Sequence, residues 1–316
     1  MRKNINTEHI EGRVYQHTLE LKTVKNEASP NYGKEFIQGT VEVAVDEDCG
    51  NIIPVEFLYV TATTKNGKAN KTYTEIQKVM EGKTVLKNGL EEATKVSIDT
   101  SLALNDFVAA DGTMVSQQIH QGGFLTVVSA LKDASLRNSF KTDMVINNIV
   151  RVEANPEKYI DNDYVAVRGV VFDFRNTLLP VEFVVHNPEG MRYFENLDVS
   201  PANPIYTCVW GKINFTNMEI QVTEESAFGE AAVNTRNRKV KQWVITGANK
   251  VPYDFGDDEV MTAAELLKAT QDREVHLADV RKRKEEAAAA KASAPAPTTG
   301  FGAPASTPVA AGSFTF

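Results

Sequence analysis

The sequence has little of what several protein classes require. Its 316 residues include only two cysteines, Cys49 and Cys208, which excludes a disulfide-stapled secreted scaffold and favours a reducing compartment such as the cytoplasm. No run of about 18 or more apolar residues occurs, and the N-terminal segment lacks the apolar stretch of a signal peptide, so we expect no membrane anchor. The histidines are scattered, and no phosphate-binding loop, paired CxxC, HExxH or GxSxG motif is present. We therefore expect no enzyme, no metal site and no cofactor.

The chain also has fewer basic than acidic residues. The chain has 34 basic and 42 acidic residues, which gives a formal net charge of −8. This balance argues against indiscriminate binding to duplex DNA or to anionic membranes. It leaves nucleic acid open as a ligand, because binding depends on where the cations lie rather than on their sum.

Charge disappears altogether at the C-terminal end. Residues 292–316 contain no charged side chain and consist mainly of Ala, Pro, Gly, Ser and Thr. Such a segment buries too little apolar surface to offset its ordering entropy, so we predict a disordered tail. Before it, Thr262 and Glu265 form a capping-box pattern that predicts the start of a helix over residues 262–291. The apolar stripe of this helix is thin, which favours a mostly solvated helix over a coiled coil.

An internal repeat is the most informative feature that is present. Residues 52–57, Ile-Ile-Pro-Val-Glu-Phe, recur as Leu-Leu-Pro-Val-Glu-Phe at residues 178–183. Each copy follows a strand that begins with a glycine, Gly39 or Gly169, and each precedes a short helix and a strand pair. This matched order predicts a duplicated domain in which the two segments form equivalent hairpins, with each proline early in a strand or at an edge, where its missing N–H is tolerated.

Each repeat unit is predicted to contain three strands, a short helix and two further strands. The first unit begins with a strand at residues 13–24, and the second with a strand at residues 144–153. This order is typical of the five-stranded OB barrel, which binds oligonucleotides across one face. A two-sheet sandwich fits the same short strands and remains the alternative. We predict a mostly β protein with two tandem OB-fold-like five-stranded barrels, residues 1–135 and 141–256, followed by the helix and the tail.

Alternation along the last strands of the second unit separates two faces. Over residues 205–215, one face carries Val209, Ile213 and Phe215, which are typical of a core, whereas the other carries aromatic rings and a lysine. Aromatic rings interleaved with cations on a β surface suit single-stranded nucleic acid, because bases stack on the rings and cations meet the phosphates. A core role for the aromatic residues is the competing interpretation. The predicted nucleic-acid-binding residues of the second unit are Tyr206, Trp210, Lys212, Arg236, Arg238, Lys239, Lys241, Trp243, Arg168 and Phe172.

The first unit carries fewer such residues. Arg13 and Tyr15 share one strand face, and Lys34 precedes a strand that contains Phe36. These four residues complete the predicted binding set, although the first unit is expected to bind less strongly or to serve in assembly.

Three segments of the first unit resemble the single-stranded DNA-binding proteins that tailed bacteriophages encode. They are GRVY at residues 12–15, GKEFIQGTV at residues 33–41 and NIIPVEF at residues 51–57. The second unit is matched only through the internal repeat. The resemblance implies an OB fold, a cytoplasmic role in replication or recombination, no cofactor and a flexible tail that recruits replication or recombination proteins. Similar bacterial proteins end in an acidic tip closed by an aromatic residue, whereas here Phe314 and Phe316 close the tail without acid, and the acidic run lies at residues 254–259.

Two functions remain open at this level. The first is a non-enzymatic protein that binds single-stranded DNA, with Phe314 and Phe316 of the tail contacting a partner protein. The second is a phage structural or adaptor protein that uses the tandem β-domains and the tail for assembly. The sequence leaves the oligomeric state open, with a homo-oligomer among the alternatives.

Overall fold

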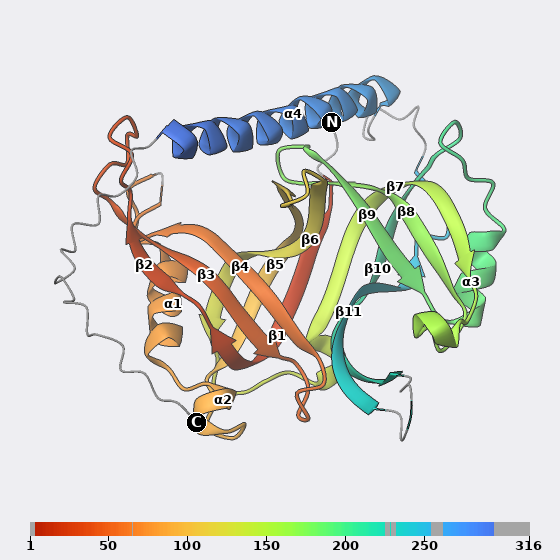
Figure 1. Cartoon of the computed structure of the whole chain (residues 1–316), viewed down its shortest axis with the longest axis horizontal. Coiled ribbons are helices and arrows are strands. Elements are labelled where there is room, and N and C mark those ends of the chain that lie inside the picture. The colour runs from red at the N-terminus through yellow and green to blue at the C-terminus, as the bar shows by residue number, and fades with distance from the viewer. Residues whose placement is uncertain (1–3, 65, 225–227, 229–231, 254–261, 294–316) are drawn as a thin grey trace, which may run out of the picture.

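The computed structural model describes residues 4–64, 66–224, 228, 232–253 and 262–293, with the backbone alone for residues 217–224, 232–238, 263 and 290–293. Eleven strands of this part of the chain form one continuous sheet (Figure 1). The strands are β1 Asn6–His17, β2 Glu20–Thr23, β3 Glu35–Ala44, β4 Ile52–Thr61, β5 Lys95–Val108, β6 Met114–Val127, β7 Asn138–Val152, β8 Tyr164–Phe172, β9 Leu178–Val185, β10 Ile205–Glu224 and β11 Ala232–Ala248. The α-helices are α1 Lys71–Glu81, α2 Val85–Asn88, α3 Pro188–Glu195 and α4 Ala263–Ser293, and the 3-10 turns are η1 Ala134–Leu136 and η2 Pro156–Lys158.

Five strands close the first barrel. β1 pairs antiparallel with β3 and β5, β3 pairs with β4, and β5 pairs with β6. A parallel contact between β4 and β6 completes the circle. α1 lies between β4 and β5 in the chain; Asn70 caps its start, Gly82 follows its end, and its buried Ile76 and Val79 face the core. The barrel predicted for the first unit is therefore present, with β2 added as an edge strand on β3.

The second barrel repeats this topology strand for strand. β7 pairs with β8 and β10, β8 with β9, and β10 with β11, while β9 and β11 meet in parallel. α3 takes the place of α1 between the third and fourth strands. The sandwich alternative is wrong, because each set of five strands closes on itself.

The repeated segments form the equivalent hairpins that the sequence predicts. Pro54 is the third residue of β4 and pairs with Glu42, and Pro180 is the third residue of β9 and pairs with Val170. The two glycines do not correspond in this alignment, since Gly39 faces Phe57 and Gly169 faces Val181. Each glycine instead permits its own close approach: an added Cβ would lie 2.4 Å from the Thr18 carbonyl oxygen at Gly39, and 2.1 Å from the Val145 carbonyl oxygen at Gly169.

The first strand of each barrel differs from its predicted bounds. The single strand expected over residues 13–24 is two strands, because the chain turns at Thr18, whose backbone N–H donates to the Thr40 carbonyl oxygen, before β2 joins the sheet edge. β7 begins at Asn138 instead of residue 144. Its first five residues pair with β1 of the other barrel. Because β1 is far away in the chain, the local sequence does not predict this pairing.

The two barrels are joined where their first strands meet. β1 and β7 hold the same place in their respective barrels and pair antiparallel, from Asn6 opposite Thr142 to Ile10 opposite Asn138. Because equivalent strands run side by side in opposite directions, an approximate two-fold axis relates the barrels. Each barrel therefore presents its fourth and fifth strands, β5–β6 or β10–β11, toward the other barrel.

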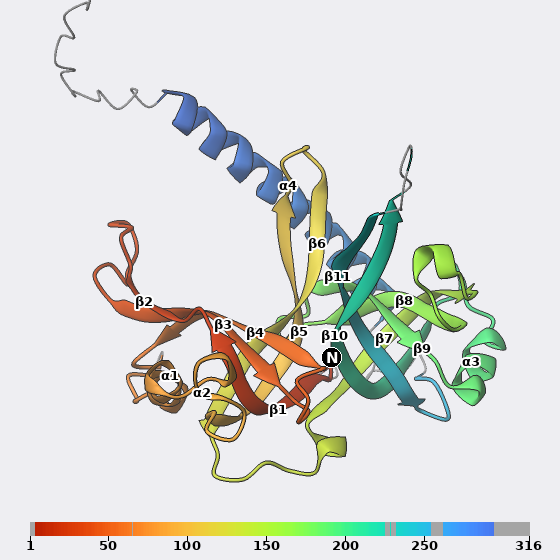
Figure 2. The same cartoon turned by 60° about the horizontal axis from the view of Figure 1, so that its bottom comes forward.

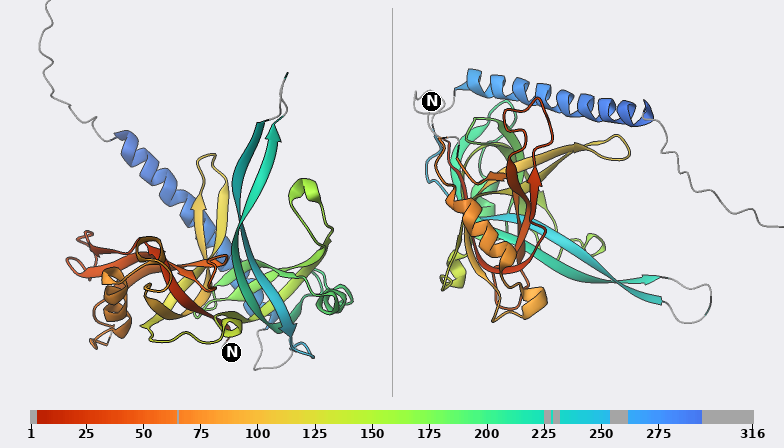
Figure 3. Two further views of the ribbon diagram at one scale, coloured as in Figure 1. Left: turned by 90° about the horizontal axis from the view of Figure 1, so that it is seen from below. Right: turned by 90° about the vertical axis from the view of Figure 1, so that its left-hand side faces the viewer.

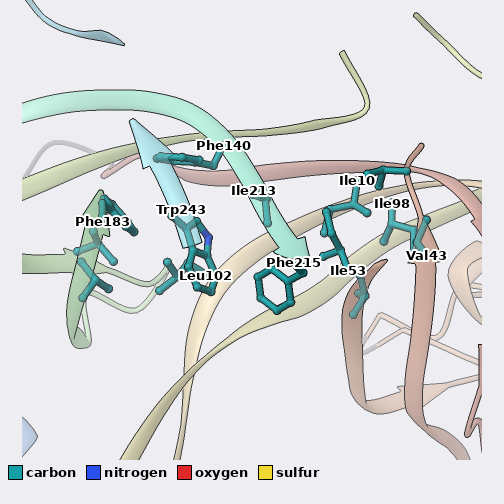
Figure 4. Packing of buried hydrophobic residues seen from close by; sticks show 14 of the residues in the cluster. Ile10, Val43, Ile53, Ile98, Leu102, Phe140, Phe183, Ile213, Phe215 and Trp243 are labelled. Carbon is teal, nitrogen blue, oxygen red and sulfur yellow. The ribbon is translucent and has the colours of Figure 1, made fainter. Parts of the chain in front are cut away.

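One hydrophobic core runs through both barrels. Phe140, Phe183, Trp243 and Phe215 of the second barrel form one cluster with Leu102 and the isoleucines of the first barrel (Figure 4). At the junction, the buried Glu8 carboxylate accepts a hydrogen bond from Trp243 Nε1 at 2.7 Å and another from Thr100 Oγ1 at 2.8 Å. The same carboxylate lies 2.8 Å from His120 Nδ1. These bonds fasten β11 of one barrel to β1, β5 and β6 of the other.

Two long hairpins project from the same side of the molecule (Figure 2; Figure 3, left). We call them the first arm, β5–β6, and the second arm, β10–β11. Helix α4 crosses the first arm, where Arg273 forms a two-pronged ion pair with Asp106 at 2.6 and 2.5 Å and also bonds to Ser116. Lys284 donates to the Val108 and Ala109 carbonyl oxygens near the hairpin tip.

Helix α4 is thus less solvated than its thin apolar stripe predicts. Its capping box is confirmed, since Glu265 and Thr262 exchange hydrogen bonds, and its later turns are exposed. Its first half, however, buries Ala269 and Arg273. None of the helices in the described part of the chain combines the length and apolar composition needed to cross a membrane.

Candidate nucleic-acid interface

A groove of about 390 Å³ lies between the first barrel and the second arm. Its floor is the outer face of β3 and β4, and β1 and the second arm form its sides. We call it the interbarrel groove. The residues that give it its chemistry are Tyr15, Thr40, Glu42, Pro54, Glu56, Phe215, Lys239 and Lys241.

Rings and cations from different barrels meet in this groove. The sequence predicted Tyr15 from the first unit and Lys239 and Lys241 from the second, and the fold brings the three together. Both lysines are exposed and Tyr15 is half-buried. Lys241 Nζ lies 5.6 Å from the centre of the Phe215 ring, within reach of a cation–π contact. Phe215 was assigned to the core from its alternation, and it packs there while also lining the groove.

Two carboxylates on the floor were missed by sequence reasoning. Glu42 accepts a hydrogen bond from Gln16 Nε2 at 2.8 Å. Glu56 lies on the neighbouring strand opposite Thr40, and no described side chain bonds to its carboxylate. Both glutamates sit on strand faces that alternation marks as outward, but nothing in the sequence indicates that this face lines a groove.

A pair of rings in tilted contact lies farther along the same strands. Phe36 of β3 and Tyr59 of β4 have ring centres 4.6 Å apart, and Tyr59 is 45% exposed. Lys22 of β2 pairs with Phe36 across the sheet, and Lys34 precedes β3, with its Nζ donating to Asn31 Oδ1. The predicted Phe36 and Lys34 are therefore together at the surface, whereas Tyr59 was missed because alternation places it on the inward face.

Three of the predicted stacking residues are buried, so their expected place on the surface is wrong. Trp243 is 3% exposed and donates to Glu8, whereas Phe172 and Tyr206 are fully buried. Tyr206 and Phe172 do lie on the outer strand face, but α4 covers that face: both pack in one cluster with Leu266 and Ala269. The Tyr206 hydroxyl also donates to Asn4 Oδ1. None of these rings can stack on a base in this conformation.

Two predicted arginines already have carboxylate partners. The Arg13 side chain is buried and its Nη2 lies 3.3 Å from Glu47, whose other oxygen binds Arg137 at 2.9 Å. Arg168 Nε lies 2.6 Å from Glu182 on the outside of the second barrel. Arg13 therefore supports the junction between the barrels, and its expected exposure is wrong.

Trp210 and Lys212 lie away from the interbarrel groove. Trp210 is 39% exposed and rests on Gly247, where an added Cβ would lie 2.5 Å from its ring atoms. Lys212 Nζ donates to the Ser135 carbonyl oxygen, and partial burial lowers the pKa of its ammonium group. We call these two residues the outer patch.

Several predicted residues fall outside what the structure describes. Arg236 and Arg238 continue β11 beyond Lys239, and their backbones pair with Ile220 and Met218, but their side chains are not among those described. The tail, including Phe314 and Phe316, and the acidic run at residues 254–259 also lie outside the described residues.

The second barrel has an equivalent surface that is closed. By hairpin register, Arg168 corresponds to Thr40, Val170 to Glu42, Leu178 to Ile52 and Glu182 to Glu56. There, Leu266 and Ala269 of α4 pack with Val170 and Leu178. The first arm also reaches this surface, because Gln118 Oε1 accepts a hydrogen bond from the Glu182 backbone N–H at 3.2 Å. Of the two related surfaces, only that of the first barrel forms an open groove lined by exposed lysines.

These features define a class of protein: tandem OB barrels joined through their first strands, with a ring- and cation-lined groove between them. The chain belongs to the YorF family, whose model matches residues 4–283. The search of the curated proteins found no match to the sequence.

Two of the solved structures that match the chain do so at low sequence identity. A deletion mutant of the single-stranded DNA-binding protein from Thermus aquaticus has 11% sequence identity and a TM-score of 0.46, over 82% of this chain and 100% of that one. A replication protein A heterotrimer bound to single-stranded DNA has 10% identity and a TM-score of 0.24, over 84% of this chain and 69% of that one.

Proposed function

We propose that the protein binds single-stranded DNA, without catalysing a reaction, in the interbarrel groove. One observation carries the proposal: the fold places Tyr15 and Phe215 beside Lys239 and Lys241 in a single groove between two OB barrels. The half-buried ring of Tyr15 offers a stacking surface that tolerates any base, the buried Phe215 supports the groove wall, and the ammonium groups meet phosphates. The Phe36–Tyr59 pair, with Lys34 close by, extends the same strand face and offers a second stacking position.

The proposal includes a biological setting that rests on the sequence resemblance. In that setting a tailed bacteriophage encodes the chain, and the protein protects single strands during replication or recombination. The C-terminal tail, with Phe314 and Phe316, recruits partner proteins. The domain limits predicted from the sequence, residues 1–135 and 141–256, belong to the same proposal.

Charge removal tests the groove against the outer patch. Each phosphate contact to a single strand contributes about 0.7 to the slope of log affinity against log salt, so Lys239→Gln with Lys241→Gln should flatten that slope by about 1.4. Lys141 of β7 pairs with Trp210 across the strands, and Lys212 follows Trp210 on β10. Replacing these two lysines, which lie outside the groove, is the matched control and should leave the slope unchanged. Fluorescence anisotropy with a labelled poly-dT oligonucleotide over a salt series measures both. A slope that falls only in the control pair would place binding at the outer patch.

Ring removal provides a second measurement on the same groove. Stacking contributes roughly 1–3 kcal/mol per base, so Tyr15→Leu should weaken binding by about tenfold while the melting temperature changes little. Wild-type protein that shows no salt-dependent binding to single strands would refute the DNA proposal and favour the structural or adaptor protein that the same β-domains allow.

A further inference from the structure

The interbarrel groove contains a charge that its proposed ligand should repel. Glu56 stands on the floor of the groove, half-buried, and no described side chain neutralises it. A carboxylate facing a phosphate costs Coulomb energy, most of all where protein walls lower the dielectric constant. If the strand lies in this groove, its phosphates must therefore face Lys239 and Lys241 on the second arm, and its bases must face the floor.

The second barrel shows that this free carboxylate is a specific difference between the repeats. Glu182 is the repeat equivalent of Glu56, and Arg168 neutralises it at a distance of 2.6 Å. In the first barrel the position of Arg168 is occupied by Thr40, which pairs with Glu56 across the strands but brings no charge. The duplicated site thus has a carboxylate in both copies and its cation in only one.

We propose that Glu56 determines base preference by accepting a hydrogen bond from an exocyclic amino group of a base on the groove floor. This inference rests on the proposed function and names the class of strand that the groove prefers. Carboxylates accept from the cytosine N4 amino group, whereas thymine and uracil present a carbonyl oxygen at that position, which a carboxylate repels. Pro54 and Ile52 beside Glu56 give the base an apolar surface to rest on. Glu42, already held by Gln16, contributes less.

Oligonucleotides that differ only at this group give the sharpest test. Labelled dC15 and dU15 are titrated with the full chain at pH 7.5 and fixed salt, and dT15 controls for the methyl group. A hydrogen bond worth about 1.4 kcal/mol corresponds to a factor of ten, so we expect the wild type to prefer dC15 over dU15 by about tenfold. Glu56→Gln should bring this ratio close to one while affinity for dU15 holds or rises. Glu182→Gln is the matched control and should leave the ratio unchanged.

A second variant keeps the test independent of any folding defect in Glu56→Gln. Thr40→Arg recreates in the first barrel the pair that Arg168 and Glu182 form in the second, so it should abolish the preference for dC15 and strengthen binding to all strands. Equal affinity of the wild type for dC15 and dU15, or a preference that survives in both variants, would overturn the inference and leave the groove proposal standing. Absence of binding to every oligonucleotide would overturn both.

Discussion

At the scale of single residues, the junction depends on a buried hydrogen-bonded set. Glu8 is buried at the centre of the molecule and relies on Trp243, Thr100 and His120 for partners. The ring of His120 lies 4.8 Å from that of Trp243 and 4.9 Å from that of Phe215. Trp243, one of the residues predicted to stack on DNA, is therefore occupied in joining the two barrels.

This arrangement predicts how Trp243 variants behave. Trp243→Phe keeps most of the ring but leaves one Glu8 oxygen without a donor, which should lower the free energy of unfolding by about 1–3 kcal/mol. Trp243→Ala should cost more, about 3–5 kcal/mol, because it also opens a cavity. Affinity per folded molecule should stay unchanged in both, as measured by denaturation and anisotropy on the same samples. Trp210→Phe, at an exposed site, is the control; a Trp243→Phe protein of normal stability and weakened binding would contradict the structure.

The strand face on which a residue lies was easier to predict than the element that packs against that face. Alternation correctly separated Val209 and Ile213 from Trp210, and it found Lys239 and Lys241 on one face. It failed for Tyr206 and Phe172, because an outward face is exposed only when nothing packs on it, and α4 lies about 60 residues or more farther along the chain. The groove itself joins strands of two barrels, and no local pattern records that proximity.

At the scale of elements, the buried ion pair between Arg273 and Asp106 is one of the contacts that hold helix α4 to the first arm. Burial by itself raises the pKa of the Asp106 carboxyl, but the bonds from Arg273 and Ser116 outweigh it and hold the pKa below its ordinary value. The pKa of Asp106 is lower in the folded state than in the unfolded state. Ionised Asp106 therefore stabilises the fold, and this contribution is complete when the pH is above the ordinary pKa range of aspartate. That contribution is lost as the pH falls through the lowered folded-state pKa.

The Asp106–Arg273 pair therefore predicts acid sensitivity. Asp106→Asn should lower the free energy of unfolding by about 3 kcal/mol at neutral pH, because it leaves the Arg273 charge buried without a counter-ion. The gap between wild type and variant should narrow as the pH falls below about 4, where the wild type also loses its carboxylate. Urea denaturation across this pH range measures the gap. Asp272→Asn, at an exposed position of the same helix, should show no such pH-dependent difference, and a gap that stays constant in acid would contradict the assignment.

Some element boundaries follow from nearby residues in the sequence, and others depend on contacts with distant parts of the chain. The end of α1 follows from Gly82, and the hairpins follow from the repeated Pro-Val-Glu-Phe segments, so these features were predictable. The early start of β7 was not, since it depends on pairing with β1. The strand predicted over residues 205–215 continues to Glu224 as β10, through apolar and polar residues in alternation, a strand pattern that the prediction missed.

At the scale of the whole molecule, two similar barrels have unlike surfaces. The floor of the interbarrel groove is open and carries Glu42 and Glu56, whereas α4 packs on its counterpart on the second barrel at Val170 and Leu178. We therefore expect one oligonucleotide site per chain. Calorimetric titration with a short strand of about eight nucleotides, within the span that one OB fold covers, should give a stoichiometry of one. Two strands per chain at saturation would mean that α4 leaves the second surface when DNA is present.

The two-fold relation between the barrels has a consequence for direction. A two-fold rotation reverses every direction perpendicular to its axis, and a nucleic-acid strand is chemically polar from its 5′ to its 3′ end. If both grooves were open, the 5′-to-3′ direction of a bound strand in one groove would be opposite to that in the other. A single strand could therefore occupy both grooves only by reversing its direction between them. Because α4 covers one of them, a strand bound in the interbarrel groove, as we propose, would have a single orientation relative to the protein. Successive copies along a strand would all face the same way, and any contact between neighbours would join the front of one molecule to the back of the next.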